Sequence, residues 1–450
     1  MARRIPAREV AGYSAGSVGT GGFGTLPGLV LAYYLTDTLA VPALMASIVV
    51  IVPKVWDVII DPAIGAMSDA ESAHRNSRTR LMTIGALTLP IGFIGTFAVP
   101  DGWSPAAAAG WVLVFFVLAT SSFSLFQVPY IALPADLTDG YRERTRLMSW
   151  RIATLTLTIL IVGAGGPALR DAAGGGRGGY LVMALVITAL LLAGMLGAVW
   201  GLRRHRAIPV EATPPVSARD SYAAGLAVIR DEPAYRALLS VFVLQALAIG
   251  IMLGAAQYVA TYVLGKQSAL TFVFLALVGP ALLVMPLWSR YAATHGKPAS
   301  LRVASLGFLA ATVALLGLLI APGWWVYVVV AVAGVSYAGM QLFPLAMLPD
   351  VIHAAGRKRG GTMSGVWTAG ETAGLALGPS IVLIALAIGG FQSSIGGVAV
   401  DQPDSARLAI VLAFSAVPAL LVMASVIVLR RYPEPASATP LTNDPEGTPL

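Results

Sequence analysis

The sequence predicts an all-α, polytopic membrane protein with about twelve transmembrane helices. Of its 450 residues, 57% are hydrophobic and only 11% are charged, whereas an average soluble domain is about 25% charged. Long apolar runs recur along the whole chain, and many reach the roughly 20 residues that a helix needs to cross a bilayer. The expected spans are 14–36, 43–68, 81–99, 107–133, 147–168, 180–202, 236–264, 268–289, 301–320, 324–348, 362–389 and 406–429.

The composition argues against several other classes of protein. The first apolar run is longer than the roughly 7–15 residues of a signal-peptide core, so we expect it to be a span. The chain has no Cys and therefore neither disulfides nor thiol chemistry. Its four His residues fall in predicted loops without the spacing of metal ligands. Because no nucleophile–base constellation stands out either, we expect no metal site, no cofactor and no enzyme activity.

The net charge of +7 reflects topology rather than a nucleic-acid partner. If the N-terminus is cytoplasmic, most Lys and Arg residues fall in cytoplasmic loops, as the positive-inside rule requires. We therefore expect both termini in the cytoplasm and the protein in the plasma membrane. We also expect it to act as a monomer.

The longest polar interruption divides the predicted spans into six and six. Residues 1–202 then form an N-terminal six-helix bundle, 203–235 a cytoplasmic linker, and 236–431 a C-terminal six-helix bundle. The last segment, 432–450, is rich in Pro, Ser, Thr and Gly, a composition typical of disorder.

The two predicted bundles also resemble each other in sequence. A shift of 215 residues places Pro129 on Pro344 and Pro134 on Pro349, and it aligns Arg, Met and Ser residues that follow. Proline-interrupted segments at corresponding places in two halves are typical of transporters built from repeats, with the substrate site between the halves. Two six-helix halves related along the membrane normal predict the major facilitator fold.

Three carboxylates lie inside predicted spans, namely Asp57, Asp61 and Glu371. Asp57 and Asp61 are four residues apart, so on a helix they share one face, one turn apart. A charged side chain inside a bilayer is costly and usually marks an ion or proton path. Carboxylate oxygens are ligands for hard cations such as Na⁺, and a desolvated carboxylate can instead bind a proton. We therefore expect a cation site, with H⁺ or Na⁺ as the coupling ion.

The segment Lys54-Val55-Trp56-Asp57, followed by Asp61-Pro62, resembles the glycoside–pentoside–hexuronide:cation symporters, the melibiose permease group of the major facilitator superfamily. The resemblance extends over most of the chain through the segments Tyr33-Tyr34-Leu35-Thr36-Asp37, Gln127-Val128-Pro129-Tyr130 and Gly374-Leu375-Ala376-Leu377-Gly378.

The resemblance implies that Asp57 and Asp61 bind the coupling cation. Ser124 corresponds to a hydroxyl of the fourth span that assists the cation in the family. Lys54 lies one turn before Asp57, and its amine would neutralise a carboxylate when the cation leaves.

The chain departs from the family at the positions that hold the sugar. The two sugar-binding Asp residues of the melibiose permeases correspond here to Gly21 and Gln127, and Ile131 replaces a Trp that stacks on the sugar. Ile60 replaces an Asn beside the second Asp, which leaves fewer neutral oxygens for Na⁺. A Lys of the eleventh span corresponds to Thr372.

Several polar or aromatic residues within spans are candidates for the substrate site. We expect Glu371 to face the central cavity and to bind substrate or relay a proton; the alternative is an interhelical pair. Gln127, Trp367, Thr372 and Tyr258 complete the expected substrate site. For the amide and aromatic residues, the alternative is an interhelical hydrogen bond or packing.

Charged residues near the cytoplasmic ends of the spans are expected to act as conformational latches. The loop Gly65-Ala66-Met67-Ser68-Asp69, with the Arg residues after it, resembles the facilitator motif between the second and third spans. These latches would hold the cytoplasmic ends together in one state, and we assign the role to Asp69, Arg78, Asp136, Arg142, Arg144 and Arg357.

Together these features predict a symporter in which H⁺ or Na⁺ drives the movement of a small solute by alternating access. The resemblance makes a sugar or glycoside the leading substrate. The alternative on the same fold is a proton-coupled exporter, or a transporter of lysolipids and other amphiphiles.

Overall fold

The structure is a computed structural model that describes residues 5–137, 141–203, 226–354, 360–396 and 400–433. Most of the predicted linker 203–235 and nearly all of the predicted tail 432–450 therefore lie outside the described residues.

The described residues of the first half of the chain form a group of six long helices, called here the N-terminal group. Its members are α1 (Ala7–Tyr33), which continues as the π-helical turn η1 (Tyr34–Thr38), then α2 (Ala43–Arg75), α3 (Thr79–Phe97), α4 (Pro105–Leu137), α5 (Tyr141–Ala172) and α6 (Gly176–Leu202).

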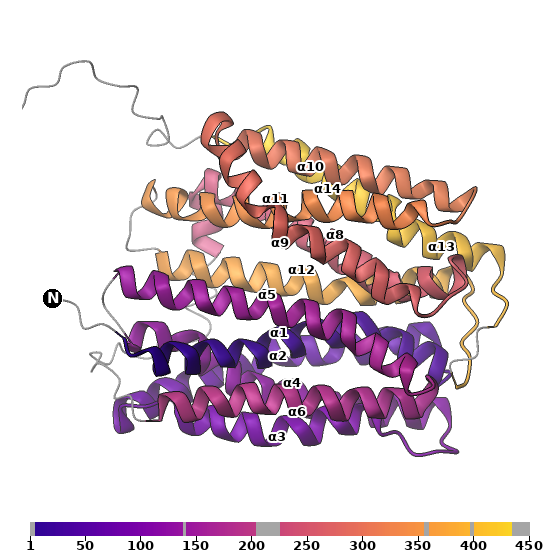
Figure 1. The fold of residues 1–450 in the computed structure, drawn as a ribbon, viewed down its shortest axis with the longest axis horizontal. Helices are drawn as coiled ribbons and strands as arrows, with labels where there is room; N and C mark the ends of the chain where they lie inside the picture. The colour runs from indigo at the N-terminus through magenta and orange to yellow at the C-terminus, as the bar shows by residue number, and fades with distance from the viewer. Residues whose placement is uncertain (1–4, 138–140, 204–225, 355–359, 397–399, 434–450) are drawn as a thin grey trace, which may run out of the picture.

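The second half forms the C-terminal group. Its members are α8 (Pro233–Tyr258) with the π-helical turn η2 (Val259–Val263), α9 (Ala269–His295), α10 (Lys297–Ala314) with the 3-10 turn η3 (Leu315–Leu319), α11 (Trp325–Ala354), α12 (Gly360–Ile388), α13 (Asp404–Phe414) and α14 (Ala416–Leu429). Figure 1 shows the two groups side by side, with α5 and α12 near their boundary.

The two ends of the bundle are distinguished by the chain's course. At the proximal end α1 begins and α14 ends; at the distal end lie η1, η2 and the start of α13 (Figure 1). Contacts of α2 with α12, of α5 with α9 and of α1 with α8 join the two groups.

Eleven helical stretches of the described residues are long and apolar enough to cross a membrane, with α13 and α14 counted as one stretch. The prediction of an all-helical, polytopic membrane protein is thereby confirmed. The remaining long helix, α1, is 27 residues long, but its many Gly, Ser and Thr residues make it less apolar. It packs between α5 and α6, and the number of twelve spans stays a prediction.

The prolines of the sequence repeat lie in helices of the same rank in the two groups. Pro129 and Pro134 lie inside α4, and Pro344 and Pro349 lie inside α11, each the fourth long helix of its group. A proline inside a helix removes a backbone hydrogen bond and bends the helix. The repeat therefore places the same local distortion in both groups.

Glycines bring α8 and α12 into backbone contact. A Cβ atom at Gly378 would lie 2.0 Å from the carbonyl carbon of Gly250, and one at Gly254 would lie 2.8 Å from the Cα of Pro379. Small residues let helices approach closely in membranes, where packing rather than the hydrophobic effect holds helices together. This contact fixes α12, which carries Glu371, against α8.

We predict that Gly378→Ala lowers the melting temperature of the detergent-solubilised protein. The added methyl group must displace backbone, and overpacking of this kind costs about 1–3 kcal/mol. Gly165→Ala is the matched control, since its Cβ would meet nothing within 4 Å and alanine favours the helix by up to about 1 kcal/mol. Equal melting temperatures for the two variants would contradict this packing.

Candidate cation and substrate site

The predicted cation site lies between α2 and α4. The ammonium nitrogen of Lys54 is 3.5 Å from Oδ2 of Asp57, whose side chain is 19% exposed. From α4, Thr120 faces Asp57 and Ser124 faces Asp61. The structure thus brings together the two acids, Lys54 and Ser124, as the sequence suggested.

Thr120 was missed at the sequence level. It precedes Ser124 by four residues, so both hydroxyls lie on one face of α4, one turn apart. This spacing repeats that of the two acids on α2, and it could have identified Thr120 as the partner of Asp57.

The acids occupy a locally weakened stretch of α2. Pro53 and Pro62 lie inside this helix, one on each side of the acid pair. Since a proline has no amide hydrogen, each removes an intrahelical hydrogen bond. Trp56 lies between them in sequence and donates from Nε1 to the Ser121 hydroxyl at 2.9 Å, which ties α2 to α4 at the level of the acids.

One oxygen of each carboxylate is left without a partner. Oδ1 of Asp57 and Oδ1 of Asp61 are both buried, with no hydrogen-bond donor among the described residues. Buried polar atoms without partners are costly, and charged ones more so. With both acids ionised and Lys54 protonated, the described side chains of the cluster leave one negative charge uncompensated. A single monovalent cation, or a proton, would remove that charge and occupy the open oxygens.

The predicted substrate residues occupy several different environments. Gln127 is half-buried on α4, and Ile131 beyond it is exposed. On α12, Glu371 is half-buried and Thr372 is exposed. Glu371 faces Gln341 of α11.

Trp367 and Tyr258 lie in contacts between helices in this conformation. Trp367 is 2% exposed and stacks on Phe242 with ring centroids 4.3 Å apart. Tyr258 is fully buried at the distal end of α8, where its hydroxyl shares a hydrogen bond of 2.8 Å with Thr36. A substrate contact of either residue stays a prediction.

The predicted latches lie largely beyond what the structure describes. Arg78 donates to the Ser68 hydroxyl at 2.8 Å, which ties the start of α3 to α2. The side chains of Asp69, Asp136, Arg142 and Arg144, and the whole of Arg357, lie outside the described part of the chain. Their role as latches stays a prediction.

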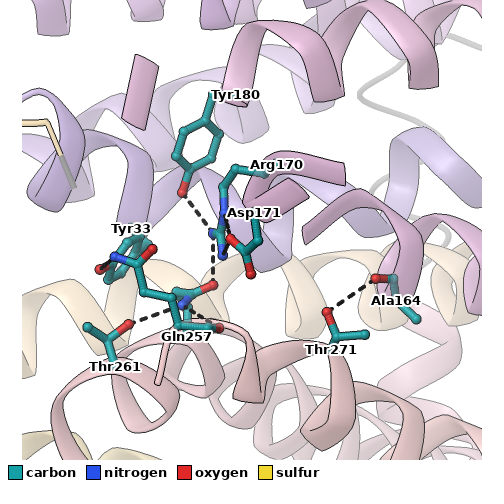
Figure 2. A network of polar contacts seen from close by, with 9 residues as sticks. Tyr33, Ala164, Arg170, Asp171, Tyr180, Gln257, Thr261 and Thr271 are labelled. Carbon is teal, nitrogen blue, oxygen red and sulfur yellow. Dashed lines mark hydrogen bonds and ion pairs between the residues drawn. The ribbon is translucent and has the colours of Figure 1, made fainter. Parts of the chain in front are cut away.

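A buried arginine joins the two groups at the distal end. Arg170 of α5 is 1% exposed, and it donates to Oε1 of Gln257 on α8 at 2.9 Å. It also donates to the Tyr180 hydroxyl at 3.2 Å and pairs with Asp171 at 2.7 Å. Figure 2 shows the guanidinium held between these three side chains, with Thr261 on the far side of Gln257.

A second distal cluster surrounds Asp37, which follows the first predicted span. Asp37 is fully buried, and it accepts hydrogen bonds from Thr36 at 2.5 Å and from Tyr262 of η2. The amide of Ser394 donates to the Thr36 carbonyl at 2.9 Å. Sequence reasoning counted three membrane acids and missed this one, although an acid directly after an apolar span was the available signal.

Together the two clusters close the distal end of the bundle. Each crosses from the N-terminal group to the C-terminal group, and the carboxylate and the guanidinium are both buried. Hydrogen bonds to charged groups contribute about 1.5–3 kcal/mol each, and separation of the distal ends has to replace two of them, Arg170–Gln257 and Tyr262–Asp37, with water. The closure is thus polar, and its hydrogen bonds can be exchanged for hydrogen bonds to water.

Two helical groups, a desolvated acid pair within one of them and a polar closure across one end are features typical of a secondary transporter. The family described as MFS/sugar transport protein matches residues 12–435. The chain therefore belongs to this family, within the major facilitator superfamily and close to the melibiose permeases.

Several relatives of the chain are symporters. The chain is 25% identical to an uncharacterized symporter of Synechocystis, over 94% of this chain and 93% of the relative. It is 26% identical to sodium-dependent lysophosphatidylcholine symporter 1 of Gallus gallus, over 90% of this chain and 82% of the relative. The chain is thus a symporter of the major facilitator superfamily, and its family and fold are those of transporters rather than enzymes.

The fold agrees with this family. A bacterial homologue of the iron transporter ferroportin, in its inward-facing state, superposes with a TM-score of 0.64 at 11% identity, over 94% of this chain and 97% of that one. At this identity the likeness concerns the fold alone. It confirms the major facilitator fold predicted from the repeat.

We predict that Gln257→Leu opens the distal end more often, because it removes the acceptor that ties Arg170 to α8. The chain has no Cys, so a single reporter can be placed at Thr38, which is fully buried at this end. A thiol reagent should label Thr38→Cys about tenfold faster in the Gln257→Leu background, since 1.4 kcal/mol corresponds to a factor of ten.

Thr312→Val is the matched control for that measurement. It removes a buried hydroxyl whose hydrogen bonds, as far as the structure describes the chain, run only to the Phe308 and Leu309 carbonyls of its own helix. If Thr38→Cys is labelled at the same rate in the Gln257→Leu and Thr312→Val backgrounds, the Arg170–Gln257 hydrogen bond does not hold the distal end closed.

Proposed function

We propose that the protein is a cation-coupled symporter in which Asp57 and Asp61 bind the coupling ion. The observation that carries the proposal is the pair of buried carboxylate oxygens without partners among the described residues, in a cluster whose described side chains leave one negative charge uncompensated. Such a cluster is costly inside a membrane unless a cation neutralises it. Its ligands face one another across α2 and α4, so a single ion could contact both helices.

Lys54 gives the site an alternative to the ion. Its ammonium group already lies 3.5 Å from Oδ2 of Asp57. When the cation leaves, Lys54 could move closer to the acids and lower the cost of their exposed charge. The competition between an internal and an external cation would then provide the differential affinity of the two states that coupling requires.

We favour Na⁺ over H⁺ as the coupling ion. The hydroxyls of Thr120 and Ser124 offer neutral oxygens where Ile60 provides none, and Na⁺ prefers oxygen ligands. The relative from Gallus gallus is named as a sodium-dependent symporter, which supports the same choice. Under a proton-coupled mechanism the same two acids would bind the ion.

The solute is a small organic molecule, for which two classes compete. A sugar or glycoside is the substrate class implied by the resemblance to the melibiose permeases. A lysolipid or related amphiphile is supported by the relative named as a lysophosphatidylcholine symporter and by the absence of acids at Gly21 and Gln127. A thermal-shift screen of both classes, with and without Na⁺, separates them because a bound ligand stabilises the folded state.

The proposed orientation follows the distribution of basic residues. With both termini in the cytoplasm, the proximal end faces inward and the distal end faces out of the cell. The conformation with a closed distal end is then the one that cannot accept solute from outside. We propose that the protein does this work in the plasma membrane as a monomer.

We predict that Asp57→Asn and Asp61→Asn each abolish ion-driven accumulation of the solute in membrane vesicles. Each amide keeps the shape of the acid but removes its charge, so the drop should be at least about tenfold, which lies within the range of typical coupling energies. Tracer uptake is measured with an imposed Na⁺ or H⁺ gradient, using the solute that the screen identifies.

Asp101→Asn is the control for loss of a carboxylate, since Asp101 is 97% exposed and pairs only with Arg177 among described residues. It should accumulate solute like the unmodified protein. Full concentrative uptake in both membrane-acid variants would refute the proposed cation site.

A further inference from the structure

A small cavity lies within the C-terminal group, between α8, α11 and α12. Its room is that of about one water molecule. The wall combines aromatic rings, amide groups and a hydroxyl with apolar side chains, and its residues include Phe242, Gln245, Tyr337, Met340, Gln341 and Leu375. None of these six residues belongs to the cation site.

Gln245 presents a buried acceptor without a donor. The residue is 2% exposed, and its Nε2 donates to the hydroxyls of Ser305 at 2.9 Å and Ser425 at 3.3 Å. Both hydroxyls donate their own hydrogens to backbone carbonyls of their helices, so they can only accept from the amide. This fixes the amide orientation and leaves Oε1 as a buried oxygen with no partner among the described residues.

Glu371 adds a negative charge beside the same cavity. It faces Gln341, and Gln341 donates from Nε2 to the Tyr337 hydroxyl at 2.9 Å. The described ion pairs, such as Lys54–Asp57 and Arg170–Asp171, involve other acids, and no described Lys or Arg pairs with Glu371. Its charge is therefore balanced by no described basic group.

No described residue thus supplies a positively charged donor to the cavity and its rim. An amide oxygen needs a hydrogen, the carboxylate needs a positive charge, and the rings of Phe242 and Tyr337 attract cations through their faces. A protonated amine is about the size of a water molecule. It can donate a hydrogen to the amide oxygen, neutralise the carboxylate and contact the ring faces. A quaternary ammonium group has no hydrogen to donate, and a neutral hydroxyl leaves the charge of Glu371 uncompensated.

We propose that this pocket recognises a protonated amine on the transported solute. The inference rests on the proposed symport and adds the substrate's chemical class. Glu371 supplies the counter-charge, Gln245 Oε1 accepts one N–H, and Gln341 with Tyr337 holds the carboxylate in place. The amine can belong to an amino sugar or to the headgroup of a lysolipid, and the two sources share this recognition.

The test compares solutes that differ only in the amine. Binding to the purified full chain is measured by calorimetry at pH 6.5 for glucosamine against glucose, and for lysophosphatidylethanolamine against lysophosphatidylcholine. In at least one pair, the member with the protonated amine should bind about tenfold or more tightly. That pair identifies the source of the amine.

Glu371→Gln should remove this preference, so that both members of the pair bind equally, and Tyr337→Phe should weaken it. Asp404→Asn removes an exposed acid at the start of α13 and should leave the preference unchanged. Glu371→Asp replaces Glu371→Gln if the latter does not fold, and should retain the sign of the preference with reduced size.

Failure of this inference can be told apart from failure of the cation site. Asp57→Asn should lose Na⁺-dependent binding while it keeps the preference for the amine. Absence of an amine preference in the unmodified protein overturns the inference, as does a preference that survives in Glu371→Gln. Equal binding of glucose and glucosamine, lost in Glu371→Gln, would instead assign the pocket to neutral hydroxyls.

Discussion

The structure depends on the cost of an unneutralised carboxylate in a medium that cannot hydrate it. Among the described residues, Asp57 and Asp61 share one positive side chain, Lys54, and each keeps one buried oxygen without a donor. Inside a bilayer such an arrangement is costly, and the cation or proton proposed above would remove that cost. The prolines of α2 and the hydroxyls of α4 both fit this role. The prolines loosen the helix that carries the acids, and the hydroxyls line the opposite wall of the cation site.

The distal clusters apply the same physics to conformational change. Arg170 and Asp37 are buried charges whose partners belong to both helical groups. While these charges keep their hydrogen bonds across the two groups, they hold the distal end of the bundle closed. If water replaces those bonds, the distal end can open. An ion bound at the acid pair can bias this equilibrium only if the pair differs between the two conformations. Helix α2, which carries the acids, contacts α12 of the C-terminal group. This contact offers one physical connection between the acid pair and the interface of the two groups.

Much of the fold could be predicted from the sequence because the bilayer imposes a simple rule. A long apolar segment must be helical, since no other backbone satisfies its own hydrogen bonds in lipid. The proline repeat also predicted that α4 and α11 are equivalent helices of the two groups. The membrane environment also made Asp57, Asp61 and Glu371 conspicuous, and the four-residue spacing placed the first two on one face.

What the sequence could not provide was the partner of each polar group. Tyr258 and Trp367 are plausible solute contacts by residue type, yet packing between helices decides where their side chains lie. Arg170 lies near a predicted loop and looks like an exposed charge until α8 brings Gln257 to it. Likewise, the sequence suggests an ordinary interhelical amide at Gln245. Only the two serine hydroxyls that orient this amide show that its oxygen has no partner among the described residues.

The most direct measurement of the central claim is equilibrium binding of radioactive Na⁺ to the purified protein. The account predicts one ion per chain, displaced as protons are added, and no binding by a double variant that carries Asp57→Asn with Asp61→Asn. Undiminished binding by the double variant would contradict it, because the ion would then be held somewhere other than between α2 and α4.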